Sequence, residues 1–230
     1  GRADSSGSDC YSKLGDHSLD SFLGRARECQ GEWKETQLRV RLRKVAAWRG
    51  RLAEFAESLA ALACDHSRKK SEVIVSEILP LIESCRFLER KARTVLAPRS
   101  TGAWTAPLWM GRVSSRVIRE ALGVVGVISP SNYPLYLGGV QVIQAVVAGN
   151  AVIWKPAPGF GALAAQLVDH MLAVGFPDNL VQVLADDEER GRVLSSAPVD
   201  KLIFTGSRET GIQVLHALAA RAVPSVMELS

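Results

Sequence analysis

The stretch GVVGVISPSNYP, from Gly123 to Pro134, decides how the rest of the chain is interpreted. Its first half is apolar and β-branched, which is typical of a strand buried on both faces. Its second half places Asn132 between Pro130 and Pro134. Proline fixes its own φ angle and restricts the residue before it, so such a frame is stiff. We therefore expect a buried strand that runs into a rigid turn and presents one amide side chain.

Strand-like and helix-like segments alternate from Gly123 onward. The expected strands are Val124–Ile128, Ala151–Trp154, Leu180–Leu184, Lys201–Phe204 and Ser225–Leu229. Helical segments fill the gaps, and this pattern indicates βαβ units around a parallel sheet. The predicted fold class is α/β, a doubly wound, Rossmann-like parallel sheet, with residues 123–230 as a dinucleotide-binding domain. Right-handed crossovers then place the ligand site at the carboxyl ends of the strands.

The segment before the sheet is expected to be helical. Apolar side chains recur at helical spacing in two stripes, Leu38–Leu62 and Ile74–Val95. Residues 32–103 are therefore predicted to form helices that pack on the sheet domain. Pro80 lies inside the second stripe, so that helix either begins near Ser76 or kinks at the proline.

Two further segments flank these helices. Residues 1–31 have a polar start without an apolar targeting region, and they are predicted to be a disordered tail. Residues 104–122 end in RVSSRVIREAL, where β-branched side chains alternate. We expect an exposed strand or hairpin arm there.

The composition is that of a globular protein, with 47% hydrophobic and 23% charged residues among 230. No apolar run reaches the length of a membrane span, so no membrane partner is expected. The segment Arg39–Arg51 is rich in arginine, and the apolar stripe beside it predicts that these arginines lie on the opposite, solvated helix face. Aromatic residues are not interleaved with the basic ones as in nucleic-acid binders, so no nucleic-acid partner is expected.

Four cysteines, Cys10, Cys29, Cys64 and Cys85, form no C-x-x-C pair. We interpret them as free thiols of a cytoplasmic protein and expect no metal site. Cys85 belongs to the second apolar stripe, so its thiol is expected to be packed rather than reactive.

Two strand-to-helix connections are candidates for a phosphate cradle. The first is GFGALA, Gly159–Ala164, which fits the dinucleotide pattern by its letters, although the preceding KPAP makes its loop long. The second is FTGSRETG, Phe204–Gly211, where a helix N-terminus offers unpaired N–H groups to an anion. Simple helix capping by Ser207 explains the second stretch equally well.

Three polar side chains follow expected strands. Lys155 either meets a phosphate or ribose or extends to solvent from the strand end. Glu228 is either a general base or a carboxylate that reaches water. Asn132 either donates its amide to a developing oxyanion or satisfies its own turn.

Several segments together resemble the aldehyde dehydrogenase family. They occur in that family's order and with close to its spacing, so the resemblance covers Glu32 to Ser230. The segments are GVVGVISPSNYPL, AGNAVIWKP, GFPDNLVQVL, VDKLIFTGSRETG and VMEL. The family oxidises a small-molecule aldehyde with NAD or NADP through a cysteine thioester. The resemblance favours Phe204–Gly211 as the phosphate cradle.

The resemblance also implies roles for individual residues. Asn132 would donate to the oxyanion, and Glu228 would activate the hydrolytic water. Lys155 would contact the adenine ribose and Ser207 the pyrophosphate. The remaining expected cofactor contacts are Ile128, Ser129, Pro130, Ser131, Phe204, Thr205, Gly206, Thr210, Gly211 and Leu229.

The resemblance further implies what this chain lacks. The family's nucleophilic cysteine follows the EL motif in a second domain, whereas the sequence ends at Ser230. We therefore expect a truncated sheet domain without the catalytic domain, inactive alone, from a protein that is a homo-oligomer through its arm when complete. The alternatives are a non-catalytic nucleotide-binding or oligomerisation module of the same fold, and a relative that transfers the acyl group to coenzyme A.

Four positions depart from the family pattern. Ser131 stands where tryptophan is frequent, and Pro158 stands where an acidic residue commonly binds the ribose hydroxyls. The choice between NAD and NADP is therefore open. LADDEERG replaces a glycine-rich loop, and its Asp186 and Asp187 disfavour phosphate oxygens nearby. Ser230 replaces a glycine, and its side chain would crowd the nicotinamide.

Overall fold

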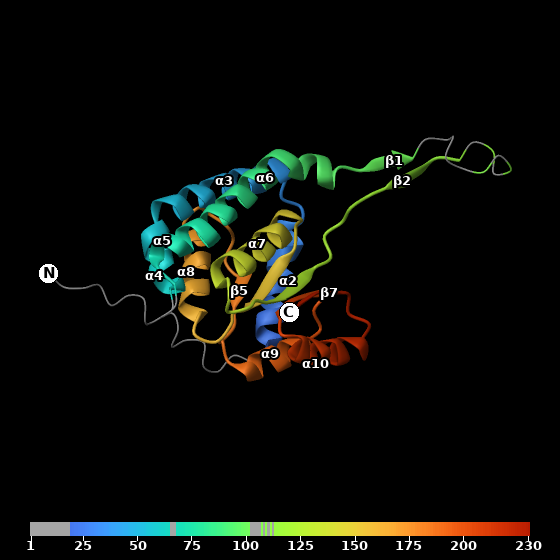
Figure 1. Cartoon of the computed structure of the whole chain (residues 1–230). Helices are drawn as coiled ribbons and strands as arrows, with labels where there is room; N and C mark the ends of the chain where they lie inside the picture. The colour runs from blue at the N-terminus through green and yellow to red at the C-terminus, as the bar shows by residue number, and fades with distance from the viewer. Residues whose placement is uncertain (1–18, 65–67, 102–106, 108, 110, 112) are drawn as a thin grey trace.

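The computed structural model describes residues 19–64, 68–101, 107, 109, 111 and 113–230. Its centre is a parallel sheet with strand order β5-β4-β3-β6-β7 (Figure 1). The strands are β3 (Val124–Ile128), β4 (Ala151–Lys155), β5 (Val181–Val183), β6 (Lys201–Gly206) and β7 (Ser225–Leu229). The five expected strands are confirmed, with ends that differ by two residues at most.

The strand order reverses between β3 and β6, which makes the sheet doubly wound. Helices α7 (Pro134–Val147) and α8 (Gly161–Leu172) follow β3 and β4. Helices α9 (Glu188–Ser195) and α10 (Arg208–Ala219) follow β5 and β6. Because parallel crossovers are right-handed, the two helix pairs cover opposite faces of the sheet. Both faces of β3 and β4 are accordingly buried along their whole length, as the predicted α/β class requires.

Helices from the first part of the chain form a further layer. They are α2 (Leu19–Trp33), α3 (Leu38–Glu54), α4 (Ala56–Ala63), α5 (Lys70–Val73), the π-helix η1 (Ile74–Ile78) and α6 (Leu79–Leu96). Helices α3 and α6 pack on each other and on α7, whereas α2 contacts β3, β4 and β5 (Figure 1). The indole N–H groups of Trp33 and Trp48 donate to the carbonyls of Val146 and Leu167, which fastens this layer to α7 and α8.

The predicted tail is wrong for residues 19–31. That segment is most of α2, and Phe22, Leu23 and Ala26 are buried in the core. Its apolar side chains recur at helical spacing, at Leu19, Phe22, Leu23, Ala26 and Trp33, and this face packs against the sheet. A local signal for the helix was therefore present in the sequence. Residues 1–18 lie outside the described part of the chain.

The first apolar stripe is divided at Phe55 into α3 and α4. The expectation that its arginines all lie on a solvated face is wrong for Arg41, which is buried. The Arg41 guanidinium donates to the carbonyls of Lys34, Thr36 and Val147. These carbonyl groups, at the ends of α2 and α7, have no N–H partner within a helix. The positive charge of Arg41 therefore has a structural role.

Neither alternative for Pro80 is correct. The helical segment begins at Lys70, and its hydrogen-bond ladder widens into the π turn of η1 before Pro80 occupies the first turn of α6. Proline is tolerated in a first turn because its missing N–H is not needed there. Glu77 lies within this π turn, four residues after Val73 and four before Leu81, and all three side chains are buried.

Strands β1 (Arg99–Thr101) and β2 (Ser115–Val117) pair antiparallel in an arm that projects from the body (Figure 1). Ser115–Val117 is exposed along its length, so the expected exposed strand is confirmed. Residues 104–106, 108, 110 and 112 of the predicted arm region are outside the described part, as are residues 102 and 103 of the predicted helical region. Within that part, no helix is both long and apolar enough to cross a membrane.

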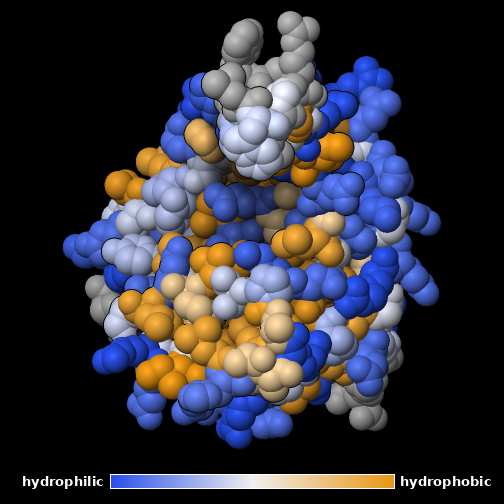
Figure 2. Space-filling model, turned by 90° about the vertical axis from the view of Figure 1, so that its right-hand side faces the viewer, coloured by the Kyte–Doolittle hydropathy of each residue, from blue (hydrophilic) through white to orange (hydrophobic). Residues whose placement is uncertain are grey.

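The sheet ends at β7, whose residues are at most half-buried. Figure 2 shows apolar side chains gathered on this face, below the arm. The exposed apolar residues of β7 and α10 are Val226, Leu229, Ile212 and Leu215. The edge of the sheet is therefore an apolar surface.

Candidate cofactor site

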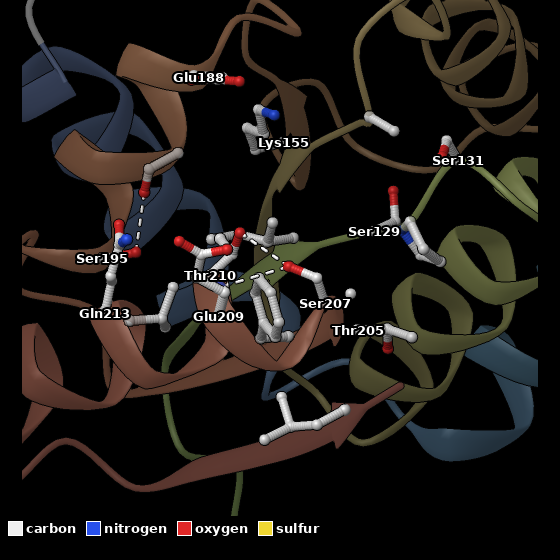
Figure 3. A pocket seen from close by; sticks show the side chains of 18 of the residues that line it. Ser129, Ser131, Lys155, Glu188, Ser195, Thr205, Ser207, Glu209, Thr210 and Gln213 are labelled. Atoms are coloured by element: carbon white, nitrogen blue, oxygen red, sulfur yellow. Dashed lines mark hydrogen bonds between the residues drawn. The ribbon is translucent and has the colours of Figure 1, made fainter.

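A cavity of about 1170 Å³ opens at the carboxyl ends of the strands, where the strand order reverses (Figure 3). It brings together side chains that follow β3, β4, β6 and β7, together with faces of α9 and α10. The predicted site residues that line it are Ile128, Ser129, Pro130, Ser131, Asn132, Lys155, Phe204, Thr205, Gly206, Ser207, Thr210, Glu228 and Leu229. A switch point is the place where doubly wound sheets bind their ligands.

Gly211 is the predicted cofactor contact that does not line the cavity. A Cβ atom at this position would lie 2.3 Å from Cδ2 of Leu229. The glycine therefore allows α10 to approach β7, and its position is one of packing.

The turn after β3 holds Asn132 at the cavity. Its Oδ1 accepts the N–H of Tyr133 at 2.9 Å, so the amide does stabilise its own turn. This bond engages the acceptor end of the amide, whereas an oxyanion needs the donor end. The two interpretations of Asn132 are therefore compatible.

Glu77 fixes the helix that begins after this turn, and the sequence patterns did not reveal it. Its Oε2 accepts the N–H groups of Leu135 at 2.8 Å and Tyr136 at 3.1 Å. Its Oε1 pairs with Nη1 of Arg68 at 2.7 Å. A buried carboxylate thus caps the N-terminus of α7, where the unpaired donors and the helix dipole favour negative charge. The signal that could have found Glu77 is its place on the apolar stripe, three residues after Ile74 and four before Leu81.

Lys155 ends β4 with only 6% of its surface exposed, so it does not extend to solvent. Within the described part of the chain, its ammonium has no hydrogen bond or ion pair with a side chain or carbonyl. Burial lowers the pKa of Lys155, and the nearby Asp186, Asp187 and Glu188 oppose this effect. Beside it, Nε1 of Trp154 donates to Oγ of Ser129 at 2.9 Å, which ties the ends of β4 and β3 together.

The first phosphate candidate is already occupied by a side chain. Oδ2 of Asp186 accepts the N–H groups of Gly159 at 2.9 Å and Gly161 at 3.1 Å. No residue of Gly159–Ala164 lines the cavity. These N–H groups serve the loop itself, which argues against this stretch as a phosphate cradle.

The second candidate lies at the cavity and is also capped. Oγ of Ser207 accepts the N–H of Thr210 at 3.3 Å and donates to its hydroxyl at 3.0 Å (Figure 3). The capping interpretation is therefore present in the structure. Because Ser207 and Thr210 both line the cavity, the N-terminus of α10 also faces the space where an anion would lie.

Glu228 is exposed and connects to a buried residue through one hydroxyl. Oγ1 of Thr205 donates to Oε2 of Glu228 at 3.3 Å. The same Oγ1 accepts Nε2 of Gln141 at 2.9 Å. Gln141, on α7, is a residue that the sequence patterns missed, because its partner is far away in the chain.

One face of α9 also lines the cavity and was not predicted. Glu188, Gly191, Arg192 and Ser195 follow the i, i+3, i+4, i+7 spacing of a single helix face. A Cβ atom on Gly191 would lie 3.7 Å from Cε of Lys155, so this face approaches Lys155 closely. Asp187 caps α9 by accepting the N–H of Arg190 at 2.7 Å.

The described cysteines, Cys29, Cys64 and Cys85, are free thiols outside the cavity lining. Burial raises the pKa of Cys85 to about 12 and also raises the pKa of Cys29. The expectation that Cys85 is packed is confirmed, and a thiol with such a pKa is a poor nucleophile. Among the described residues, no group of His, Cys, Asp and Glu side chains is arranged to hold a metal ion.

A doubly wound sheet with a large cavity at its switch point defines a dinucleotide-binding class of domain. The buried, unpaired cation and the helix N-terminus at that cavity suit the ribose and phosphates of such a ligand. The model of the Aldehyde dehydrogenase family matches residues 10–230, and the chain belongs to this family. The expected resemblance is confirmed.

Curated relatives agree with the family. The chain is 29% identical to a 4,4'-diapolycopene aldehyde oxidase of Methylomonas sp., over 92% of the chain and 40% of that relative. It is 33% identical to a probable coniferyl aldehyde dehydrogenase of Pseudomonas aeruginosa, over 71% of the chain and 33% of that relative. The chain thus spans two fifths or less of the length of these relatives.

Solved structures share the fold. An NADP-dependent glyceraldehyde-3-phosphate dehydrogenase from Bacillus halodurans, complexed with NADP, has a TM-score of 0.82 at 27% identity and covers 92% of this chain and 44% of its own. A Mycobacterium tuberculosis aldehyde dehydrogenase complexed with NAD⁺ has a TM-score of 0.83 at 26% identity, with 92% and 43% covered. The two carry different cofactors, so this likeness does not select between them.

Proposed function

We propose that this chain is the cofactor-binding part of an oxidoreductase that oxidises a small-molecule aldehyde to a carboxylic acid with NAD or NADP through a cysteine thioester. The observation that carries the proposal is the single cavity at the switch point, which gathers Asn132, Lys155, Ser207 and Glu228 from the ends of four strands. The family to which the chain belongs supports the same reaction class.

Lys155 and the N-terminus of α10 are the proposed holders of the cofactor. The Lys155 ammonium donates to the adenine ribose, and the N–H groups around Ser207 face the pyrophosphate. Ile128, Ser129 and Pro130 form the edge of the cleft. The bound NAD(P) supplies the hydride acceptor.

Asn132 and Glu228 are the proposed catalytic residues. The Asn132 amide donates to the oxyanion that forms when a thiolate attacks the aldehyde carbon, an interaction that lowers the barrier by about 3 kcal/mol in acyl-transfer enzymes. Glu228 takes a proton from the water that hydrolyses the thioester. The Thr205 hydroxyl that donates to Glu228 holds its carboxylate in place for that step.

The thiolate is the part of the reaction that the described residues do not supply. Cys29, Cys64 and Cys85 are outside the cavity lining. We therefore assign aldehyde oxidation to the complete protein and cofactor binding to this chain. The apolar surface of β7 and α10 supports this assignment, because an exposed apolar face of this kind suits coverage by further protein (Figure 2).

Self-association through the arm is also part of the proposal. Val117 and Ile118, on and beside β2, are 50% and 59% exposed. Apolar side chains on a projecting hairpin suit burial against a second copy, so the complete protein is proposed to be a homo-oligomer. The free thiols Cys29, Cys64 and Cys85 support the reducing conditions of the cytoplasm.

Titration of the purified chain with NAD and with NADP by isothermal calorimetry tests the proposal. We expect saturable binding of at least one cofactor, and Lys155→Met is expected to weaken it about tenfold because a charged hydrogen-bond donor is lost. Lys201→Met is the matched control, since Lys201 begins β6 at the opposite end of the sheet. A chain that is folded by circular dichroism and binds neither cofactor contradicts the proposal, as do equal losses in both variants.

A further inference from the structure

The cavity has one end where charges of both signs meet, between the end of β4 and the lining face of α9. The buried Lys155 ammonium and the Glu188 carboxylate both lie there (Figure 3). Arg192 is the second cation in the lining, and Asp186 and Asp187 are the other carboxylates near Lys155. The balance among these groups decides whether a neutral or an anionic ligand group fits beside Lys155.

Two of the three carboxylates are engaged by the protein backbone. Asp186 accepts the N–H groups of Gly159 and Gly161, and Asp187 accepts the N–H of Arg190. Glu188 lies 4.0 Å from Arg192, and these side chains are 84% and 70% exposed. Such an exposed pair contributes little, so Glu188 is the carboxylate that a ligand hydroxyl can engage most easily.

The charge cluster lies at a position that contacts the ligand in other doubly wound sheets. In doubly wound sheets that bind dinucleotides, the group following the second strand contacts the 2′ position of the adenine ribose. A carboxylate there accepts the 2′-hydroxyl of NAD, whereas a cation accommodates the 2′-phosphate of NADP. The second strand of this sheet is β4, and it ends in a cation, Lys155, with the acidic first turn of α9 beside it.

We infer that Glu188 is the specificity-determining residue of this site and makes the chain prefer NAD to NADP, an inference that rests on the proposed function. A ribose hydroxyl accepts from Lys155 and donates to Glu188, which uses both groups. A phosphate with a charge of about −1.5 to −2 gains from Lys155 but is repelled by Glu188, with Asp186 and Asp187 behind it. Pro158 has no carboxylate with which to bind the ribose hydroxyls, and Glu188, on α9, supplies one instead.

Arg192 defines the opposing possibility. If its guanidinium turned toward Lys155, the two cations would form a phosphate site and favour NADP. Its contacts with Glu188 and with Oε2 of Glu189, the latter at 3.5 Å, both hold it on the acidic side of α9. The two arrangements predict opposite cofactor preferences.

Calorimetric titration of the whole chain with NAD and NADP, in the parent and in Glu188→Gln, tests the inference. The parent is expected to bind NAD about tenfold more tightly, and Glu188→Gln is expected to reduce that ratio about tenfold, chiefly through tighter NADP binding. Glu57→Gln is the control. It removes the same charge from an exposed position on α4, outside the cavity lining and without a contact to Arg192, and should leave the ratio within about twofold.

Each other outcome overturns the inference. A parent that binds NADP as tightly as NAD, or more tightly, supports the cationic arrangement, and Arg192→Gln should then abolish that NADP binding. Equal effects of Glu188→Gln and Glu57→Gln reduce the role of Glu188 to general surface charge. A folded chain that binds neither cofactor overturns the proposed function together with this inference, and is distinguished from the other results by the missing NAD isotherm.

Discussion

The connection from β4 to α8 and the connection from β6 to α10 look alike in sequence, and their backbone N–H groups have different partners. In the first, Asp186 reaches across from the loop after β5 and occupies the N–H groups of Gly159 and Gly161. In the second, Ser207 caps its own helix and the connection borders the cavity. A glycine-rich connection becomes a ligand site only when no neighbouring side chain has taken its donors.

The helix start after β3 extends this comparison. There a carboxylate from another element, Glu77, closes the N-terminus of α7 just as Asp186 closes the loop before α8. Of these three helix starts, the one after β6 is not capped by a carboxylate: the Ser207 hydroxyl caps it and the Ser230 carbonyl accepts the Arg208 N–H at 3.2 Å. It is the one proposed to hold the pyrophosphate. Three substitutions at these helix starts test this contrast, and a fourth, at His170, tests the packing against α8.

Glu77→Gln is expected to have the largest effect on stability. It removes a fully buried charge that pairs with Arg68 and accepts two N–H groups of α7, and the loss of one partner of a buried pair costs about 3 kcal/mol. Urea unfolding measures the change in free energy. Glu83→Gln is the control, because its pair with Arg86 is exposed and is expected to contribute less than about 0.5 kcal/mol. Equal effects would show that Glu77 does not close α7 as described.

Asp186→Asn should destabilise the chain by about 1–2 kcal/mol, because the N–H groups of Gly159 and Gly161 lose a charged acceptor. Urea unfolding is again the measurement, with the exposed Asp178→Asn as the control. If stability is unchanged and NAD binds more tightly, the N–H groups of the first connection hold phosphate once the charge is removed, and the comparison is reversed.

Ser207→Ala should cost about 1 kcal/mol of stability through the lost cap and should also weaken NAD binding several-fold. Ser207→Ala is thus expected to lower both stability and NAD affinity, whereas Asp186→Asn is expected to lower stability alone. Ser225→Ala, at the amino end of β7, is expected to change neither quantity appreciably. A stability loss with unchanged affinity would leave Ser207 as a cap alone.

His170, on α8, is expected to give a smaller, pH-dependent effect. Burial and the neighbouring Arg51 lower its pKa, while Asp169 and Glu54 oppose this. The ring lies against Phe55 at 4.7 Å, and its Nδ1 accepts Nε of Arg51. Because the folded pKa lies below the unfolded value of about 6.5, the unfolded chain takes up a proton first as the pH falls.

The stability contribution of His170 is therefore complete above about pH 6.5 and declines as the pH falls through the folded pKa. Thermal unfolding between pH 5 and pH 8 measures this slope. In His170→Gln the part of the slope due to this residue should disappear, since glutamine does not titrate. An unchanged slope would assign the pH dependence to other groups.

The predictions that succeeded concern single elements and their order. The strands after Gly123 and the exposed strand at Ser115–Val117 follow from local apolar patterns. The gathering of Asn132, Lys155, Ser207 and Glu228 at one cavity follows from strand order and right-handed crossovers, because the carboxyl ends of parallel strands share one edge.

The predictions that failed mostly concern partners distant in the chain. Burial of Arg41 depends on the end of α7, which no local period reports, whereas α2 was missed although its apolar side chains have helical spacing. Gly211 matched a motif, but its closeness to Leu229 gives it a packing position. Gln141 was missed because its partner, Thr205, is far away in the chain, and the α9 face was missed because a helical residue was judged by its own stripe rather than by the cavity that it borders.

The sequence by itself determined the α/β class, the strand order along the chain and the family, because hydrophobic period and linked motifs are properties of the chain read in order. The tertiary structure decided which backbone N–H groups are hydrogen-bonded by distant side chains and which charged side chains lie together. Asp186 lies 25 residues beyond Gly161, and Glu77 lies 58 residues before Leu135. Such hydrogen bonds form only when folding brings separate elements together, so no local pattern specifies them.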